Sequence, residues 1–291
     1  MKQLTIVGAG WAGLAAAVSA TQAGWHVQLF EASKTAGGRA RSLSEYFEEK
    51  PLDNGQHILI GAYSSTLSLM RFVGLNTEAL LQRLPLDLRL ANGQGLRLPN
   101  LPRPLNLLVG LGFARGWTLI DKTKLALAAW QYAQFKCDPT WTVEQLCEFS
   151  KISPRVKSQL IEPLCLSALN TPLTQASAEV FLRVLRDSLF NGPGSSDLLV
   201  PRVDLGSLLP DTCLQWLSAR GADIKLGQRL SASHIEAMQN ISSEKNATLL
   251  ACPPWEAARL TEKIAPKWAH ECAQMQHTAI ATVYFRCKDK N

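Results

Sequence analysis

Two short apolar runs flank a small-residue segment at the start of the chain. Leu4-Thr5-Ile6-Val7 has the length of a buried parallel strand, and a second run, Trp25 to Phe30, ends on Glu31. Between them, Leu14 to Ala23 is rich in alanine and is followed by Gly24, a residue type that commonly ends helices. This order predicts a strand–helix–strand unit whose two strands lie parallel in one sheet.

The middle of the chain is predicted to be helical, with one hairpin. Residues 63–82 are predicted as helical, residues 86–98 as a hairpin that turns at Asn92-Gly93, and residues 105–190 as mainly helical. Thr142 and Gln145 have the spacing of a capping box, and Thr171-Pro172 predicts another helix start. The apolar face of the helix that follows comprises Ala176, Val180, Phe181, Val184, Leu185 and Leu189.

The last hundred residues return to an α/β pattern. Residues 191–196 predict a loop, residues 207–219 a helix, and residues 221–227 the return from a helix to a strand. Ala247 to Pro254 predicts a core strand that ends in a double proline, and Thr278 to Phe285 predicts a final strand.

The turn between the first strand and helix, Gly8-Ala9-Gly10-Trp11-Ala12-Gly13, has a G-x-G-x-x-G spacing. Gly8 permits a tight turn, Gly10 lets a pyrophosphate approach the backbone, and Gly13 lets the helix pack close to the strand. The helix N-terminus, with Trp11 and Ala12, offers N–H groups and positive dipole charge to phosphates. Glu31 lies at the expected distance to accept hydrogen bonds from a ribose diol. A lone glycine motif is a weak signal, but this context predicts a dinucleotide site, for NAD or FAD.

A second glycine pair follows Glu31 and narrows the choice of cofactor. The segment Gly37-Gly38-Arg39-Ala40-Arg41-Ser42 resembles the glycine–arginine extension of the FAD-binding amine oxidase and phytoene desaturase superfamily. The resemblance implies FAD, with the backbone of Gly37 and Gly38 and the side chain of Arg39 near its pyrophosphate and flavin. A buried guanidinium beside a phosphate has a ready partner, so Arg39 is the favoured side-chain ligand.

The composition suits a globular protein with a substantial core, since 46% of the 291 residues are hydrophobic and 19% are charged. Seven scattered cysteines without a C-x-x-C pair predict reduced thiols in a cytoplasmic protein, not a disulfide or zinc framework. The five histidines show no metal-ligand spacing, so no metal site is predicted. Met1-Lys2 leads directly into the first strand, which predicts no signal peptide.

Most of the net charge of +6 lies in residues 71–124, which contain eight basic and three acidic residues. Residues 98–116 are also rich in leucine and proline, but they lack the roughly 18 to 20 consecutive apolar residues of a membrane span. Peripheral contact with the inner face of the cytoplasmic membrane through 98–116 is one interpretation; a buried helix pair with solvated arginines is an equal one. Nucleic acid is not a predicted partner, because these cations have no aromatic stacking partners.

Three further motifs resemble the hydroxysqualene dehydroxylases, a branch of the same superfamily. They are Asp53-Asn54-Gly55-Gln56-His57, Glu162 to Pro172, and Ser196 to Arg202. The resemblance implies an isoprenoid lipid substrate, hydroxysqualene, whose allylic hydroxyl is replaced by hydride from reduced FAD to give squalene in hopanoid synthesis. Gln56, within the first of these motifs, is included among the cofactor-binding residues.

Candidate catalytic residues come from the same motifs. Ionising an allylic alcohol needs a proton donor and an apolar pocket that tolerates a delocalised cation. His57 is the first candidate for a polar group near the flavin, and a structural histidine bonded to the backbone is an equally good interpretation. Asp53 can orient His57, although capping of a turn is favoured. Glu162 and Asn170 either line the substrate pocket or serve helix packing and capping.

Together these elements predict an α/β fold: a Rossmann-like FAD-binding domain with a parallel sheet as in glutathione reductase, and an inserted, largely helical α+β substrate domain. The expected FAD-binding domain is residues 1–62 and 195–260, with the helical substrate domain at 63–194 and the start of its sheet at 261–291. Relatives close the FAD site with a second glycine-rich turn, which is not found before Lys288-Asp289-Lys290-Asn291, so the C-terminal part is expected to be missing. Carotenoid-precursor desaturation, amine oxidation and an inactive FAD-binding fragment are the alternatives.

Overall fold

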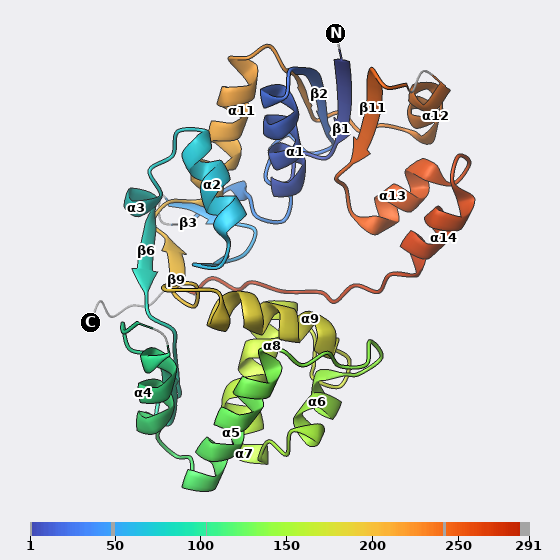
Figure 1. Cartoon of the computed structure of the whole chain (residues 1–291). Coiled ribbons are helices and arrows are strands. Elements are labelled where there is room, and N and C mark those ends of the chain that lie inside the picture. Colours follow the sequence, from blue (N-terminus) through green and yellow to red (C-terminus); the bar gives the residue numbers. More distant parts are fainter. Residues whose placement is uncertain (1, 48–49, 103, 241–242, 286–291) are drawn as a thin grey trace. The chain divides into compact units, whose positions relative to one another are not determined.

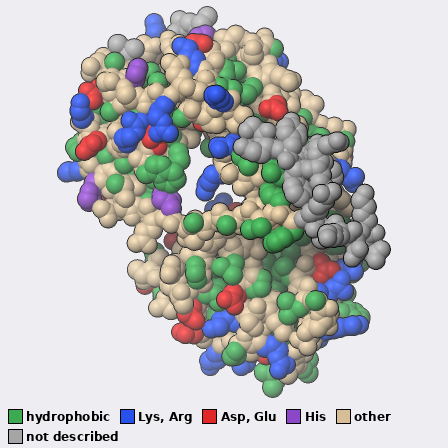
Figure 2. Space-filling model, turned by 180° about the vertical axis from the view of Figure 1, so that it is seen from behind, with side chains coloured by type: hydrophobic (Ala, Val, Ile, Leu, Met, Phe, Trp, Pro, Cys, Tyr) green, Lys and Arg blue, Asp and Glu red, His purple; other side chains and the backbone are tan. Residues whose placement is uncertain are grey.

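The computed structural model describes residues 2–47, 50–102, 104–240 and 243–285. The chain divides into two compact units, whose elements are labelled in Figure 1. Unit 1 comprises residues 1–57, 65–81 and 201–291, and unit 2 comprises residues 58–64 and 82–200. Figure 2 shows one face, on which hydrophobic side chains lie among charged ones.

A four-stranded parallel sheet in the order β10–β2–β1–β11 forms the centre of unit 1. Val7, at the end of β1, lies opposite Phe30 of β2 and Leu250 of β11. Strands buried on both faces are near-continuous apolar runs, which is why the first two were recognisable in the sequence. The strands are β1 Lys2–Val7, β2 Trp25–Glu31, β10 Asp223–Leu226 and β11 Asn246–Leu250.

Helices and a hairpin complete unit 1. Helix α1 buries Leu14, Ala17 and Val18 and packs beside α11. Ile235 of α12 and Leu260 of α13 belong to a second apolar cluster, which includes strand residues of the sheet. The helices are α1 Trp11–Gln22, α2 Ser64–Phe72, α3 Thr77–Leu80, α10 Leu205–Leu208, α11 Pro210–Ser218, α12 Ala232–Asn240, α13 Pro254–Thr261 and α14 Pro266–Gln274, and the hairpin strands are β3 Ser42–Phe47 and β4 Lys50–Asp53.

Unit 2 is mainly helical, as its sequence predicts, and its core includes the buried residues Val143, Leu146, Phe181 and Leu182. Its helices are α4 Leu105–Phe113, α5 Leu119–Tyr132, α6 Val143–Phe149, α7 Pro154–Val156, α8 Glu162–Leu169 and α9 Ala178–Leu185, with π-helical turns η1 Lys157–Ile161 and η2 Arg186–Phe190. Its strands are β5 Leu59–Ile60, β6 Leu81–Leu84, β7 Asp87–Arg89, β8 Gly95–Arg97 and β9 Leu198–Pro201, in a β5–β9–β6 sheet and a β7–β8 hairpin.

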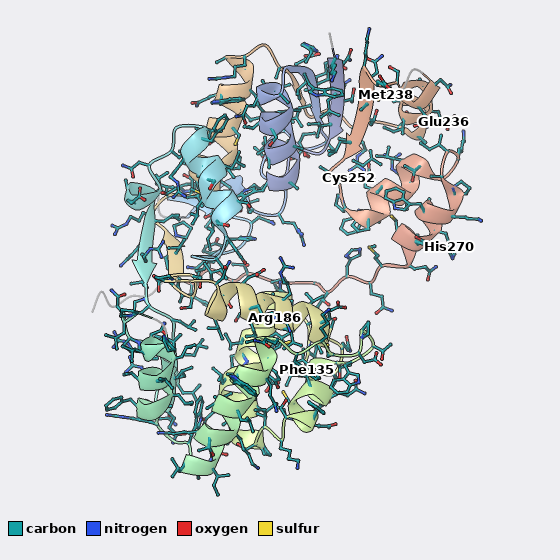
Figure 3. All side chains as sticks on the ribbon, in the orientation of Figure 1. Phe135, Arg186, Glu236, Met238, Cys252 and His270 are labelled. Atoms are coloured by element: carbon teal, nitrogen blue, oxygen red, sulfur yellow. The ribbon has the colours of Figure 1, made fainter. Side chains whose placement is uncertain are left out.

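One side chain of unit 2 ties helix ends together. Arg186, at the start of η2, donates from Nε to the Tyr132 carbonyl oxygen at 2.9 Å and from its guanidinium to the Phe135 carbonyl oxygen, as Figure 3 helps to locate. Tyr132 is the last residue of α5, where helix carbonyls lack intrahelical partners, and Phe135 lies in the segment that follows the helix. Arg186 of η2 therefore supplies a hydrogen-bond donor to the carbonyl group that ends α5.

Several predictions of local structure are wrong. Residues 278–285 form no strand, because no strand among the described residues pairs with them. The predicted helix start at Pro172 lies at Ala178 instead, with Ser177 as its cap. The residues before Ala178 form turns. They are held by hydrogen bonds from Val143 N–H to the Ala176 carbonyl oxygen and from Glu144 N–H to the Leu173 carbonyl oxygen.

Two further predictions need correction. Val180, predicted on the buried face of α9, is 50% exposed, because the buried face runs through residues 178, 181, 182 and 185. Residues 63–82 are two helices and not one, since Gly74 has φ +99° and Asn76 caps α3. Within the described part of the chain, no helix has the length and apolarity needed to cross a bilayer.

Candidate functional site

The turn from β1 into α1 is built by three glycines with different constraints. Gly8 has φ +108°, a conformation that favours glycine, and a Cβ there would lie 2.5 Å from the Ala251 carbonyl oxygen. A Cβ at Gly13 would lie 1.9 Å from the Gly8 carbonyl oxygen. At Gly10, with φ −68°, a Cβ would meet nothing nearer than the Gly38 Cα at 3.8 Å. Gly8 and Gly13 therefore permit close packing, whereas the space beside Gly10 is open.

The second glycine segment lies against this turn. Gly37 N–H donates to the Ala9 carbonyl oxygen at 2.8 Å, and Gly10 and Gly37 form a parallel bridge. A Cβ at Gly38 would lie 3.0 Å from the Gly10 Cα. The Trp11 indole donates from Nε1 to the Ala40 carbonyl oxygen at 3.1 Å. The two glycine segments are thus joined backbone to backbone at the N-terminus of α1.

Glu31 brings a carboxylate to the same place from the end of β2. Its Oε2 accepts from Ala9 N–H and its Oε1 from Ser33 N–H, each at 2.8 Å. Each carboxylate oxygen can accept a further hydrogen bond, so the group can still bind a diol. Parallel β1 and β2 end at the same edge of the sheet, which explains why residues 22 positions apart meet here.

This arrangement has the chemistry of a dinucleotide site. Helix α1 begins without a side-chain cap bond at Gly10, so the N–H groups of its first turn are available to an anion. The open side of Gly10 admits a group that a Cβ would displace, and Glu31 offers acceptors beside it. These residues fit the ADP part of FAD: the helix N-terminus suits the pyrophosphate and the carboxylate suits the ribose.

The remaining predicted cofactor residues are more exposed. Ala12 is exposed in the first turn of α1, and Gln56 is exposed in the loop after β4. The sequence predicts a buried guanidinium at Arg39, but this residue is exposed. Burial of this guanidinium would therefore have to come from a bound group.

The two candidate catalytic residues both make structural contacts. His57 Nδ1–H donates to the Gly55 carbonyl oxygen at 2.8 Å. Because Nδ1 is engaged in this contact, Nε2 is the ring nitrogen that could act on a bound group. Asp53 Oδ1 accepts from Leu205 N–H at 3.0 Å and lies 2.9 Å from Ser42 Oγ. Asp53 thus connects β3, β4 and the start of α10, which is a structural role but at a helix start 152 positions away and not in a local turn. A catalytic role for either residue stays a prediction.

Sequence reasoning missed a polar network around Asp53. Ser42 Oγ lies 2.6 Å from Asp204 Oδ1, which also accepts from Ser207 N–H at 3.0 Å and so caps α10. Burial raises the pKa of Asp204, but the hydrogen bonds from Ser42 and Ser207 outweigh it, so that pKa is lowered overall. The Asp204–Ser207 spacing is a recognisable cap signal, whereas its link to Ser42 is not local.

A tyrosine from the far end of the chain holds the backbone of Asp53. The Tyr284 hydroxyl donates to the Asp53 carbonyl oxygen at 2.8 Å and accepts from Asp53 N–H at 3.2 Å. The contact spans 231 positions, so no sequence pattern signals it. It gives residues 275–285 a fixed point beside the His57 loop.

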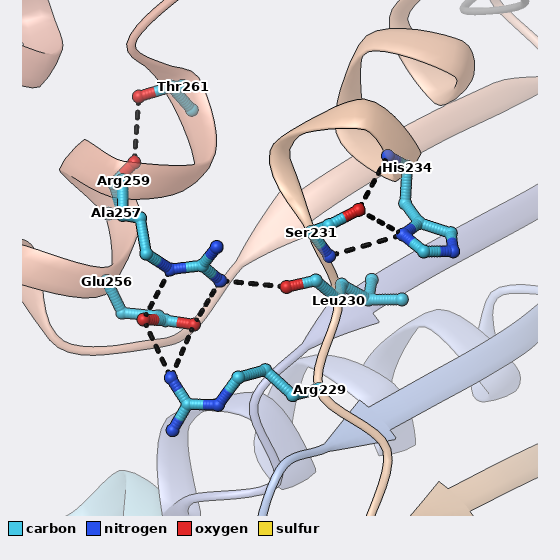
Figure 4. Close-up of polar contacts among 8 residues, drawn as sticks. All are labelled: Arg229, Leu230, Ser231, His234, Glu256, Ala257, Arg259 and Thr261. Carbon is cyan, nitrogen blue, oxygen red and sulfur yellow. Dashed lines mark hydrogen bonds and ion pairs between the residues drawn. The ribbon is translucent and has the colours of Figure 1, made fainter.

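Glu256 organises a second charged cluster in unit 1, which Figure 4 shows. Its carboxylate accepts from Arg259 at 2.7 and 3.0 Å and from Arg229 at 3.1 and 3.2 Å. Arg259 also donates to the Leu230 carbonyl oxygen at 2.8 Å. The hydrogen bond from Arg259 holds the pKa of Glu256 below its usual value. The cluster ties α13 to the segment after β10, next to Cys252, whose pKa burial raises to about 11.

Two curated relatives resemble most of the chain. The hydroxysqualene dehydroxylase of Zymomonas mobilis is 29% identical over 278 residues, which is 89% of this chain and 64% of the relative. That of Sinorhizobium fredii is 28% identical over 287 residues, 89% of this chain and 63% of the relative. The chain thus spans less than two thirds of the length of the curated relatives it matches.

A solved structure and a family model agree with this likeness. An oxidoreductase from Methanosarcina mazei superposes with a TM-score of 0.63 at 16% identity, covering 94% of this chain and 65% of that one, which confirms the predicted α/β fold. The model of flavin containing amine oxidoreductases matches residues 11–290. The chain therefore belongs to the flavin containing amine oxidoreductase family, and its cofactor is FAD.

Proposed function

We propose that the protein is an FAD-dependent oxidoreductase that converts hydroxysqualene to squalene by reductive removal of the allylic hydroxyl. The observation that carries the proposal is the likeness to two hydroxysqualene dehydroxylases over 89% of the chain. The glycine turn with Glu31 supports it, because it offers a dinucleotide site in the same polypeptide.

The residues of the glycine turn would hold the ADP part of FAD. Gly10, with Trp11 and Ala12 in the first turn of α1, would bind the pyrophosphate. Glu31 would accept hydrogen bonds from the ribose hydroxyls. Arg39, exposed beside Gly38, would supply positive charge to the phosphates. Gly8, Gly13 and Gly37 would act through the backbone geometry that brings these groups together.

The reaction needs a hydride, a proton and a place without water. FAD held by these residues would, when reduced, supply the hydride and its two electrons. The C–O bond of the substrate would be replaced by a C–H bond, and the hydroxyl would leave with one proton as water. In this proposal His57 carries the proton on Nε2, because its Nδ1 is occupied by the Gly55 carbonyl. The Tyr284–Asp53 contact would keep the His57 loop in one position.

The test is anaerobic turnover of hydroxysqualene by the purified protein loaded with FAD and chemically reduced, with squalene measured by mass spectrometry. We expect squalene in proportion to bound FAD. Turnover of a phytoene-type or amine substrate, without squalene, would show that the reaction belongs to another branch of the family. Absence of all three activities in protein that retains FAD would refute an enzymatic role for this chain.

The role of His57 is tested separately with His57→Asn. The asparagine amide can still donate to the Gly55 carbonyl, but it cannot carry a proton at neutral pH. We expect unchanged FAD binding and a loss of about 10²- to 10⁴-fold in the rate of squalene formation. A rate within about threefold of the unaltered protein would limit this histidine to its structural hydrogen bond.

A further inference from the structure

Two helices of unit 2 turn apolar side chains to the outside. In α4 and α5 the side chains of Phe113, Leu119 and Trp130 are 81%, 77% and 75% exposed. We define the α4–α5 surface by six of the exposed apolar residues on these helices, which are Leu108, Phe113, Leu119, Ile120, Leu127 and Trp130. Exposed faces of helices in globular proteins are normally polar, so this surface calls for an occupant.

The α4–α5 surface is additional to the core contacts of the same helices. Gly110, on the inner side of α4, lies so close to the hairpin that a Cβ would be 2.8 Å from the Arg97 carbonyl oxygen. Ala128 and Tyr132, on the inner side of α5, belong to the core of unit 2. Each helix therefore packs into unit 2 through one face, and the apolar side chains of the α4–α5 surface lie outside that packed face.

Basic side chains surround this surface. Arg115 and Lys124 are exposed, Lys122 Nζ donates to the Gly112 carbonyl at 2.6 Å, and exposed Arg155 donates to the Gly116 carbonyl at 2.9 Å. Asp121 is the single acidic residue between positions 98 and 136.

That one carboxylate is already engaged. Asp121 Oδ2 lies 2.9 Å from the Thr118 N–H and 2.8 Å from its hydroxyl, in the capping box of α5. A hydrogen bond from Ser153 and those from Thr118 lower the pKa of Asp121. Asp121 thus stays ionised while it caps the helix, and the four basic side chains named above outnumber this one acidic group.

We propose that the α4–α5 surface docks the protein on an anionic lipid bilayer. Phe113 ends α4, and Leu119 and Ile120 begin α5, so these exposed side chains can enter the acyl boundary while the nearby lysines and arginines meet lipid phosphates. The surface extends beyond the segment 98–116, because Leu119, Ile120, Leu127 and Trp130 contribute to it. The proposal does not depend on the reaction proposed above, since lipid binding needs neither FAD nor substrate.

The charge pattern favours lipid over a protein partner. A second copy would place these cations against the same cations, since a two-fold interface joins identical patches. The headgroups of anionic lipids carry negative charge that can face the cations of the protein. The acyl layer beneath them is apolar and can take up the apolar side chains. Each basic residue near such a surface is expected to raise binding about fivefold.

The test is co-sedimentation of the full 291-residue chain with vesicles of phosphatidylcholine alone or with about one third phosphatidylglycerol. We expect at least about tenfold tighter binding to the anionic vesicles. The double variant Leu119→Gln, Ile120→Gln should weaken that binding about tenfold or more, because two side chains lose apolar burial. Arg115→Gln with Lys124→Gln should weaken binding to anionic vesicles and leave binding to neutral vesicles unchanged.

Matched controls come from other surfaces. Val180→Gln removes a half-exposed apolar side chain from α9, and Lys267→Gln removes an exposed lysine from α14; neither should change vesicle binding. Circular dichroism and thermal unfolding confirm that each variant folds. Equal binding to both vesicle types, or no binding, would overturn the proposal. A dimer in light scattering that dissociates in the Leu119–Ile120 variant would overturn it in favour of self-association.

Discussion

Gly13→Ala should destabilise the protein, although alanine is the better helix former. In an open helix the change would stabilise by about 1 kcal/mol. Here the new Cβ would lie 1.9 Å from the Gly8 carbonyl oxygen and 3.3 Å from the Ala251 Cβ. The first distance is about 1.5 Å shorter than the 3.4 Å at which ordinary van der Waals contact begins. Its partner is a backbone atom, so no change of side-chain rotamer can relieve the clash. Helix α1 would have to move away from the end of β1.

The magnitude follows from these opposing terms. Overpacking of this kind costs about 1–3 kcal/mol and sometimes more, and a backbone contact puts this site at or above the upper end. After the propensity gain, we expect a net loss of at least about 2 kcal/mol. For a chain of 291 residues, with an unfolding entropy of about 2.1 cal/mol/K per residue, that corresponds to a fall of roughly 3 °C or more in the melting temperature.

Urea unfolding followed by circular dichroism measures the loss, with Gly112→Ala as the control. Gly112 lies in α4, where a Cβ would meet nothing within 4 Å, so alanine there should stabilise by about 0.5–1 kcal/mol. If Gly13→Ala is as stable as the unaltered protein while Gly112→Ala behaves as expected, the close packing of α1 on the β1 turn is not as described.

Three further predictions concern charged groups. Glu31→Gln should weaken FAD binding about ten- to a hundredfold in a fluorescence titration, since a charged acceptor facing the ribose is lost; unchanged affinity would exclude that role. Arg186→Ala should lower the free energy of unfolding by about 1–3 kcal/mol, because the carbonyls of Tyr132, which ends α5, and of Phe135, just after it, lose their donor, whereas Arg183→Ala should cost less than about 0.5 kcal/mol; equal effects would contradict this. Glu256 has a lowered folded-state pKa, so its stabilising contribution is present above its unfolded pKa of 4.5 and is lost as the pH falls through the folded value. Glu256→Gln should therefore flatten the pH dependence of stability in that acid range, and an unchanged dependence would show that the charge cluster contributes little.

Local signals predicted the parts of the structure that local contacts determine. The strand–helix–strand unit follows from its apolar runs and glycines, and Thr142 with Gln145 forms the predicted capping box. The hairpin turns at Asn92-Gly93, where Gly93 has φ +78°. Asn170, with φ +50°, ends α8 as its C-cap, which supports the capping interpretation of that residue.

Other features depend on residues far apart in the sequence. Thr278 to Phe285 has the composition of a strand, but a strand needs a neighbour that local sequence cannot specify. The Ser42–Asp204 contact joins residues 162 positions apart, and sequence periodicity carries no information about such pairs. Glu31 reaches the glycine turn because parallel strands end together, which is a rule of topology and not of local propensity, and its contact with a ribose stays a prediction.

The most direct test of the proposed cofactor site is FAD titration of Gly10→Ala against Gly112→Ala. At Gly10 the backbone accepts alanine and the Cβ meets only the Gly38 Cα, at 3.8 Å, so stability should change by less than about 1 kcal/mol. The same Cβ would occupy the space that the pyrophosphate needs. We predict that Gly10→Ala folds normally and binds FAD at least about a hundredfold more weakly, while Gly112→Ala binds it as the unaltered protein does. Equal FAD affinity in the two variants would contradict the account, because the cofactor would then lie elsewhere.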